Sequence, residues 1–243
     1  MPESIELSVV APVHNEAGNA APLAREIAKV LEGRSYELIF VDDSSRDETR
    51  AELAAVRAEI PALRILSHRQ NAGQSRSVRS GVLAARAPLV ATLDGDGQND
   101  PADIPRLLAR LIRQDAPANL AMVSGQRGKR ADAPNRKFAS QLANGVRRRL
   151  LGDGAADSGC GIKVFRKDAF LRLPYFDHMH RYMPALMRRE GYAVEFLDVN
   201  HRSRQAGRSN YTNLGRLAAA ASDLFGVMWL NSRFRNPGAA DEL

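Results

Sequence analysis

The chain has 243 residues, of which 44% are hydrophobic, and this is enough to bury the core of one large α/β domain. Lysine and arginine (35) outnumber aspartate and glutamate (28), and the net charge of +7 favours anionic partners such as phosphates, nucleic acid or a membrane surface. Cys160 is the single cysteine, which excludes an intrachain disulfide and multi-cysteine zinc or iron–sulfur sites and indicates a reducing cytoplasm.

Neither a signal peptide nor a membrane-spanning helix is expected. Residues 1–6 lack the basic start and long apolar core of a signal peptide. The longest apolar stretch, Leu217–Leu230, is interrupted by Ser222 and Asp223 and is shorter than the roughly 20 residues that a spanning helix needs. We therefore expect a chain that acts in the cytoplasm and does not cross a bilayer.

Strand and helix patterns alternate from the N-terminus to about residue 125. The first strand is predicted at Leu7–Val13, and a helix with Leu23 and Ile27 on its buried face follows it. Further strands are predicted at Tyr36–Val41, Leu63–Leu66, Leu89–Leu93 and Leu120–Ser124, with helices begun by a Ser45–Glu48 capping box, at Gln74–Ala87 and after Asp100–Pro101. This alternation predicts a Rossmann-like, mostly parallel α/β sheet with helices on both faces.

Polar residues follow the first, second and fourth predicted strands. They are Asn15 and Glu16, Asp42 and Asp43, and the run Asp94-Gly95-Asp96-Gly97-Gln98. Because the carboxyl ends of parallel strands lie along one edge of the sheet, we expect these residues to line one crevice.

The run from Asp94 to Gln98 has the composition of a divalent-metal and phosphate site. Asp94 and Asp96 offer hard oxygen ligands, Gln98 adds a neutral oxygen, and the glycines between them let the backbone approach a bulky anion. Mg²⁺ or Mn²⁺ is held by one or two carboxylates and completes its shell with water and substrate phosphate. An isolated Asp-x-Asp is more often a surface turn, but the convergence of several strand ends favours the site.

The remaining part of the chain has a different character. A basic loop at Gly125–Arg130 precedes an amphipathic helix at 137–151, whose Arg147–Arg149 run suits either a solvated face or an anionic membrane surface. Strands are predicted at Gly159–Arg166 and Tyr192–Val199, and a short helix at Lys167–Leu173. His178 and His180 suit a metal pair less well than surface histidines, and Phe225–Leu230, which contains Trp229, suits either the core or a docking helix.

A series of motifs in this order and spacing resembles family 2 glycosyltransferases, and within them the dolichyl/polyprenyl-phosphate sugar transferases. The likeness extends from about residue 5 to residue 215. The motifs are Ser8–Glu16, Val41–Ser45, Asn71–Gly73, Asp94–Gln98, Gly125–Arg127, Asp157–Gly161 and Arg204–Tyr211. An ordered series is far more specific than any one short motif.

The resemblance implies a GT-A fold, a nucleotide-sugar donor, Mg²⁺ or Mn²⁺, and inversion at the sugar carbon. By motif position, Pro12, His14 and Glu16 would line the nucleoside, Asp43 would contact the base or ribose, Asp94 and Gly95 would lie near the ribose and sugar phosphates, Asp96 and Gln98 would hold the metal, and Arg127 and Arg204 would face the phosphates. Three positions depart from the family pattern: His14 replaces the usual tyrosine, Gly97 a larger apolar residue, and Cys160 the usual serine. The identity of the base and of the sugar therefore stays open.

The acceptor can be argued from chemistry. A phosphate monoester has a second pKa of about 6, so a lipid phosphate is largely ionised at neutral pH and needs no general base. The basic residues of the loop, Arg127, Lys129, Arg130 and Arg136, would attract it. A saccharide hydroxyl would need a base, for which Asp157 is the candidate. We favour transfer of a hexose from a GDP- or UDP-sugar to polyprenyl phosphate at the cytoplasmic face of the membrane.

This interpretation divides the chain into a catalytic domain at 1–210, an amphipathic segment at 211–235 that docks on the membrane or an integral membrane partner, and a disordered tail at 236–243. A basic nucleic-acid-binding protein is the alternative of another class, but aromatic residues total only 6% and the arginines follow no RNA- or DNA-binding pattern. A sugar nucleotidyltransferase would have a glycine-rich phosphate loop after the first strand, which is missing here. The sequence does not indicate an oligomeric state.

Overall fold

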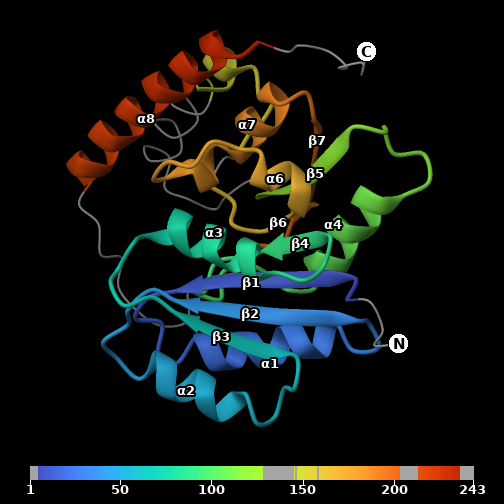
Figure 1. Cartoon of the computed structure of the whole chain (residues 1–243), viewed down its shortest axis with the longest axis vertical. Coiled ribbons are helices and arrows are strands. Elements are labelled where there is room, and N and C mark those ends of the chain that lie inside the picture. Colours follow the sequence, from blue (N-terminus) through green and yellow to red (C-terminus); the bar gives the residue numbers. More distant parts are fainter. Residues whose placement is uncertain (1–4, 128–144, 146, 158, 203–212, 236–243) are drawn as a thin grey trace, which may run out of the picture.

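A computed structural model describes residues 5–127, 145, 147–157, 159–202 and 213–235, with only the helical path given for 213–220. A seven-stranded sheet with strand order β3-β2-β1-β4-β6-β5-β7 forms its centre (Figure 1). The strands are β1 Leu7–Val13, β2 Tyr36–Asp42, β3 Leu63–Ser67, β4 Leu89–Thr92, β5 Leu120–Arg127, β6 Lys163–Arg166 and β7 Ala193–Val199. The helices are α1 Ala20–Val30, α2 Thr49–Val56, α3 Gln74–Ala84, α4 Asp103–Ile112, α6 Lys167–Leu171, the 3₁₀ helix η1 Met179–Arg181, α7 Met183–Arg189 and α8 Asn213–Arg233.

The sheet is mostly parallel, as the alternation of patterns predicts. β1 to β4 run in one direction, and β7 runs parallel to β5. β6 is antiparallel to both of its neighbours, β4 and β5. In this register Lys163, the first residue of β6, lies opposite Thr92, the last residue of β4. The segment that precedes β6 therefore reaches the carboxyl edge of the parallel strands.

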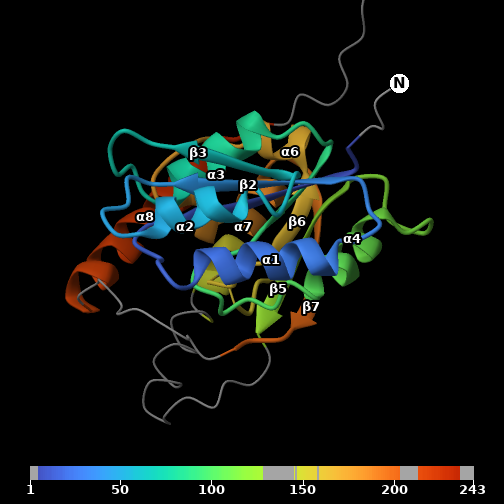
Figure 2. The same cartoon turned by 90° about the horizontal axis from the view of Figure 1, so that it is seen from below.

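Helices cover both faces of the sheet because its strands alternate apolar side chains between them. Val9 of β1 and Ile27 of α1 lie in one buried cluster, together with residues of α2 and α4. Val10 of β1 and Val82 of α3 lie in a second cluster, together with residues of α6 and α7. Figure 2 shows α1 on one side of β2 and β3, with α3 on the other.

Close packing of α3 against β1 fixes the position of the helix start. A Cβ atom added to Gly81 would lie 2.3 Å from Cγ1 of Val10, so the helix backbone approaches the strand more closely than any side chain at this position would allow. The N-terminus of α3, with Gln74, is thereby held at the carboxyl edge of the sheet.

The capping box predicted at Ser45 and Glu48 is wrong. α2 begins at Thr49, and its N-cap residue, Glu48, makes no side-chain cap hydrogen bond. The Ser45 hydroxyl instead accepts a hydrogen bond of 3.0 Å from the backbone N–H of Asn15, and Asp47 accepts from the N–H of Thr49 at 3.1 Å. The Ser45 hydroxyl, which the local pattern assigned to the helix cap, is thus used in a long-range contact with the loop after β1.

The arginine run of the predicted 137–151 helix does not form one solvated or membrane-facing surface. Arg147 is only 7% exposed, and its guanidinium pairs with the fully buried Asp153 at 2.6 Å. Arg148 and Arg149 are exposed. The prediction is wrong for Arg147 because the buried carboxylate of Asp153, six residues later in the chain, needs a cation as partner. Phe138, Leu142 and Val146 lie outside the described residues.

α8 lies within the segment predicted for docking. Val227 is buried, whereas Phe225 is 68% and Trp229 59% exposed, so Trp229 does not belong to the core. Among the described residues, no helix has the length and apolar character needed to cross a membrane. The tail at 236–243 lies outside the described residues.

Candidate active site

The ends of β1, β2 and β4 adjoin at one edge of the sheet. The backbone N–H of Asp43, after β2, donates to the carbonyl of Val13 at 2.8 Å, and Nδ1 of His14 lies 2.8 Å from the carbonyl oxygen of Asp43. After β4, a Cβ on Gly95 would lie 2.7 Å from the carbonyl oxygen of Pro12. The structure thus brings the predicted nucleoside residues and the Asp-Gly-Asp run to one place, as parallel topology requires.

Hydrogen bonds fix the loop that carries His14 and Glu16. The N–H of Glu16 donates to the Thr49 hydroxyl at 2.8 Å, and its carboxylate accepts from the Asn19 side chain at 2.8 Å. Asn15 has a positive φ of 54°, which asparagine tolerates better than most residues. The loop is therefore held both by its contact with the start of α2 and by the local contact of Glu16 with Asn19.

Asp43 organises the turn that begins α3. Its carboxylate accepts hydrogen bonds from the backbone N–H groups of Ala72 (2.9 Å) and Gly73 (2.8 Å), and it pairs with His68 at 2.7 Å. Gly73 has a φ of 84°, which favours glycine. These bonds position Gln74, the first residue of α3, so Asp43 shapes the site through the backbone in addition to the ribose or base contact expected of it.

Asp94 and Asp96 form the centre of the site. Gln74 donates to Asp94 Oδ1 at 2.7 Å, and Asn99 accepts from the backbone N–H of Asp94 at 3.0 Å. Burial, and next the nearby charge of Asp96, raise the pKa of Asp94. Asp96 is 8% exposed, and its carboxylate accepts from the N–H of Gln98 at 3.1 Å.

The donor set at this position fits a hard divalent cation. Asp94 and Asp96 are close enough for one negative charge to disfavour the other, and a cation between carboxylates relieves that repulsion. The part of the chain that the structure describes has no cluster of three or more His, Cys, Asp or Glu side chains able to hold a metal. A cation here would draw its remaining ligands from water and substrate phosphate, as Mg²⁺ and Mn²⁺ do.

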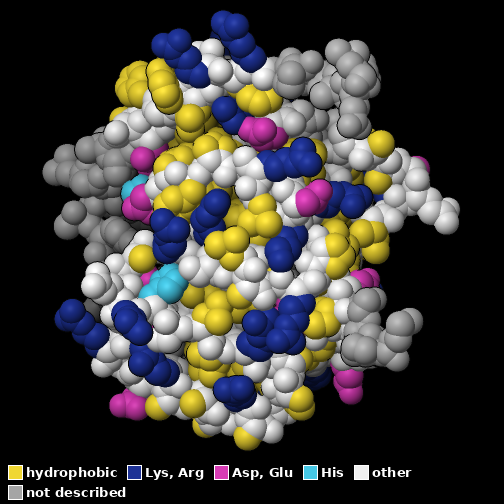
Figure 3. All heavy atoms as spheres, in the orientation of Figure 1, with side chains coloured by type: hydrophobic (Ala, Val, Ile, Leu, Met, Phe, Trp, Pro, Cys, Tyr) yellow, Lys and Arg dark blue, Asp and Glu magenta, His cyan; other side chains and the backbone are white. Residues whose placement is uncertain are grey.

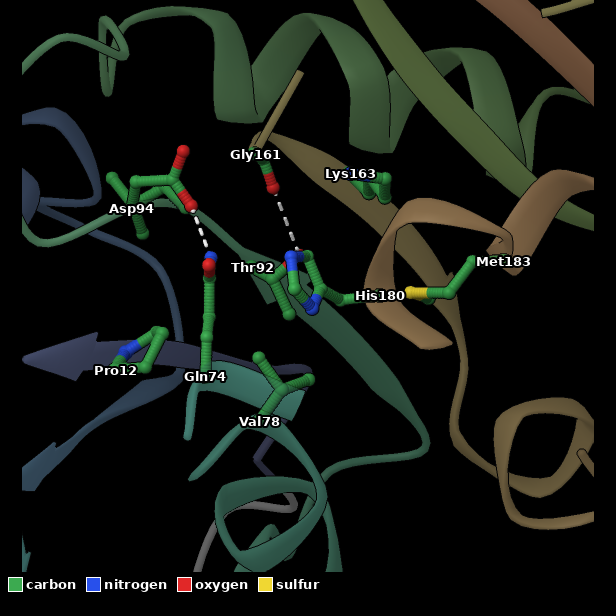
Figure 4. A pocket seen from close by; sticks show the side chains of 10 residues that line it. Pro12, Gln74, Val78, Thr92, Asp94, Gly161, Lys163, His180 and Met183 are labelled. Carbon is green, nitrogen blue, oxygen red and sulfur yellow. Dashed lines mark hydrogen bonds between the residues drawn. The ribbon is translucent and has the colours of Figure 1, made fainter. Parts of the chain in front are cut away.

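Glycine forms the floor beneath Asp94. A Cβ on Gly161 would lie 2.4 Å from the carboxylate carbon of Asp94, so only glycine leaves room for this carboxylate. The backbone carbonyl of Gly161 accepts a hydrogen bond from the Thr92 hydroxyl at 3.2 Å (Figure 4). β6 begins at Lys163, so the observed strand is shorter than the predicted one at Gly159–Arg166.

Arg127, at the end of β5, pairs with Asp157. Its Nη2 donates to Asp157 Oδ1 at 2.7 Å and its Nε donates to Oδ2, which makes the ion pair bidentate. Burial alone would lower the pKa of Arg127, but the contact with Asp157 outweighs burial and leaves that pKa raised. The guanidinium is also close enough for its positive charge to lower the pKa of Asp94, against the larger effect of burial. Arg204, Lys129, Arg130 and Arg136 lie outside the described residues.

Two basic side chains that sequence reasoning did not assign to the site line a small cavity next to Asp94. Lys163 is only 4% exposed, and its ammonium donates to the carbonyl of Cys160. His180, on η1, is hydrogen-bonded through Nδ1 to the Ser75 hydroxyl at 2.7 Å. Lys163 and His180 line the cavity together with Pro12, Gln74 and Asp94 (Figure 4).

His178 and His180 do not act as a pair. His178 bonds to Asp223 of α8 at 2.9 Å, whereas His180 bonds to Ser75 of α3. Both histidines are half-buried, and burial lowers the pKa of His180 well below the ordinary value, so neither is a fully exposed surface histidine. Cys160 is 1% exposed and burial raises the pKa of its thiol, which agrees with the small buried residue expected there.

The fold and site together define a Rossmann-like α/β protein whose crevice, at the carboxyl edge of its sheet, presents two carboxylates and an arginine. The family model described as glycosyl transferase family 2 matches residues 8–173. The chain belongs to this family. Membership excludes the nucleic-acid-binding and nucleotidyltransferase alternatives as descriptions of the domain.

Solved structures support the fold. Glucosyl-3-phosphoglycerate synthase from Mycobacterium tuberculosis, in complex with Mn²⁺, UDP and glucosyl-3-phosphoglycerate, has a TM-score of 0.70 at 16% identity and covers 96% of this chain and 82% of that one. The predicted GT-A fold is therefore confirmed.

Curated relatives are polyprenyl-phosphate sugar transferases, so the predicted branch of the family is confirmed as well. Dodecaprenyl-phosphate galacturonate synthase of Rhizobium johnstonii is 34% identical over 97% of this chain and 70% of its own length. The undecaprenyl-phosphate 4-deoxy-4-formamido-L-arabinose transferase of Edwardsiella ictaluri is 30% identical over 84% of this chain and 62% of its own length. The one of Pseudomonas aeruginosa is 32% identical over 93% of this chain and 66% of its own length. The chain thus spans less than two thirds of several of these relatives.

Proposed function

We propose that the chain is the catalytic domain of an inverting, metal-dependent transferase that moves a hexose or hexuronic acid from a nucleotide-sugar to a polyprenyl phosphate. The observation that carries the proposal is the pair Asp94 and Asp96 at the sheet edge, close enough to Arg127 for its charge to act on Asp94. The named relatives act on prenyl phosphates, which supports the acceptor class. Their sugars differ, since a galacturonate carries a carboxylate and a formamido-arabinose does not.

The residues of the chain divide the work of sugar transfer. Asp96 and Gln98 would hold the divalent cation, with Asp94 beside them, and the bound cation would stabilise the charge that develops on the departing nucleoside diphosphate. Pro12, His14 and Glu16 line the part of the crevice proposed for the nucleoside. Arg127 supplies a fixed positive charge for the phosphates, and because it is held by Asp157 it needs no rearrangement to do so.

The contacts of Asp157 favour a phosphate acceptor over a saccharide hydroxyl. Both carboxylate oxygens of Asp157 accept hydrogen bonds from Arg127, and Oδ1 also accepts from the backbone N–H of Gly159 at 3.2 Å. A carboxylate held in this way is a poor proton acceptor, because protonation would break the ion pair. A lipid phosphate attacks the sugar carbon without a base, from the side opposite the leaving group, and this inverts the configuration.

A lipid acceptor also requires contact with a bilayer or a membrane partner, and α8 is the proposed docking element at the cytoplasmic face. Phe225 and Trp229 are four residues apart on one side of the helix and are both largely exposed. Figure 3 shows hydrophobic side chains at the surface over α8, while lysine and arginine are spread across the whole of that face.

The test is a product assay with the purified chain, a panel of UDP- and GDP-sugars, Mn²⁺ or Mg²⁺, and a short polyprenyl phosphate. We expect a sugar-lipid product with one donor, loss of product with EDTA, and a fall of roughly 100-fold or more for Asp96→Asn. The exposed, distant Asp115→Asn is the matched control and keeps full activity. Product formed equally well by Asp96→Asn, or transfer to a saccharide and not to the lipid phosphate, would overturn the proposal.

A further inference from the structure

The cavity beside Asp94 presents more hydrogen-bond donors than the described residues can satisfy. An ammonium has three N–H groups, and the Lys163 ammonium donates to the carbonyl of Cys160 alone among the residues that the structure describes. Lys163 is 4% exposed, so water reaches it poorly. Burial lowers the pKa of this ammonium, and the charges of Asp94 and Asp157 act in the opposite direction. The Lys163 ammonium therefore lines the cavity as a buried cation with N–H groups that are available to a ligand.

The hydrogen bonds of His180 indicate that it adds a second donor. The Ser75 hydroxyl oxygen accepts from the backbone N–H of His180 at 3.3 Å and lies 2.7 Å from its Nδ1. The hydroxyl proton finds an acceptor only if it is donated to Nδ1, and the ring proton then resides on Nε2. Nε2 has no partner within the described part of the chain, and the ring lines the cavity. His180 thus offers an N–H where Lys163 offers an ammonium.

The position of this cavity connects it to the substrates. Pro12, Gln74 and Asp94 also line it, and these residues lie at the sheet edge proposed for the nucleotide-sugar (Figure 4). Gln74 already donates one of its two N–H groups to Asp94, and Lys163 and His180 add the charged donor and the ring N–H of the cavity. A neutral hydroxyl would use one of them, whereas a group with two acceptor oxygens and a negative charge would use both and neutralise the ammonium.

We propose that Lys163 and His180 form a subsite for an oxyanion group of a substrate, and that Lys163 is a specificity-determining residue of the transfer reaction. The inference rests on the proposed function. Two sources of the oxyanion have the required chemistry: the carboxylate of a hexuronic acid donor and the phosphate of the lipid acceptor. The subsite belongs to the second half of the chain, since Lys163 begins β6 and His180 lies on η1.

Calorimetry with the full chain and Mn²⁺ distinguishes these sources. The probes are UDP-galactose against UDP-galacturonate, GDP-mannose against GDP-mannuronate, and farnesyl phosphate. The variants are Lys163→Met, which keeps the length of the side chain without its charge, and Lys29→Met, which removes an exposed lysine of α1 as the matched control. His180→Leu tests the second donor independently, should Lys163→Met fail to fold.

If the subsite takes a sugar carboxylate, Lys163→Met weakens uronate binding roughly 10- to 100-fold and leaves the neutral sugar within about threefold. If it takes the acceptor phosphate, farnesyl phosphate loses affinity by that factor and both sugars of a pair keep theirs. His180→Leu shifts the same probe in the same direction by a smaller factor. The inference is overturned if Lys163→Met and His180→Leu weaken every probe equally or none at all. The proposed function fails separately, if no nucleotide-sugar yields a lipid product.

Discussion

Gly161 shows how much of the site depends on the absence of one atom. Its Cβ would lie 2.4 Å from the carboxylate carbon of Asp94, and the backbone beneath is tied to Thr92. We expect Gly161→Ala to displace Asp94 and to lower turnover by about 100-fold, since small misplacements in an active site are costly. Gly226→Ala is the control, because nothing lies within 4 Å of a Cβ there. Equal turnover in the two variants, measured in the product assay, would show that Asp94 adapts freely.

His180 makes the stability of the chain depend on pH. Its pKa is lowered well below 6.5 in the folded state, chiefly by burial, so below pH 6.5 the unfolded chain binds a proton that the folded chain does not. The contribution of this histidine to stability is therefore lost as the pH falls, at up to about 1.4 kcal/mol per pH unit. Urea unfolding at pH 7.5 and 5.0 should show a smaller loss for His180→Gln than for wild type. The exposed His201→Gln should behave like wild type; a loss in His180→Gln as large as in wild type contradicts the expectation.

Some of these residues could be predicted from the sequence and others could not. Asp94, Asp96 and Asp43 follow apolar runs, so the local sequence pattern predicts that they lie at strand ends. Lys163 stands inside an apolar run, Ile162–Phe165, and nothing local shows that it meets a catalytic edge. That position arises because β6 pairs antiparallel with β4, which is a long-range choice.

At the scale of elements, the strands could be predicted from the sequence, whereas the start of one helix could not. Continuous apolar runs predict the positions of β1, β2 and β5 to within a few residues, because these strands are buried on both faces of the sheet. The start of α2 could not be predicted, since Ser45 is bound by the loop after β1 rather than by the helix. A capping pattern describes a local option, and a tertiary hydrogen bond removes it.

The helical turn around Arg147 and the loop after it are held together by one buried ion pair. Arg147 contacts Asp153 at 2.6 Å and the carbonyl oxygen of Ala155 at 2.9 Å, and Asp153 is 0% exposed. Arg147→Met leaves the carboxylate of Asp153 buried without a cation, so we expect a loss of about 3–5 kcal/mol in the free energy of unfolding. The double variant Arg147→Met/Asp153→Asn should recover part of it. A loss below about 1 kcal/mol in the single variant, measured by urea unfolding, would contradict this account; Arg148→Met, at an exposed position, is the control.

At the scale of the whole molecule, the exposed face of α8 is expected to govern lipid contact. Phe225→Ser/Trp229→Ser removes two largely exposed apolar side chains and should lower flotation of the chain with anionic liposomes at least about tenfold, since each apolar group contributes to interfacial binding. Leu83→Ser removes an apolar side chain of α3 that is 57% exposed and should float like wild type. Wild type that does not float alone would indicate docking on an integral partner instead.

The division of the sheet has a consequence for how this enzyme can diversify. Pro12, Asp43 and Asp94 come from β1, β2 and β4, whereas Arg127 and Lys163 come from β5 and β6. The two walls of the crevice are thus encoded by consecutive stretches of the gene, which are joined within the sheet by the reversed strand β6 and outside it by contacts such as Ser75–His180. Exchange of the later stretch between homologues would change the residues around the transferred group and the acceptor and would leave the nucleoside and metal residues after β1, β2 and β4 in place, so the same scaffold could serve new pathways.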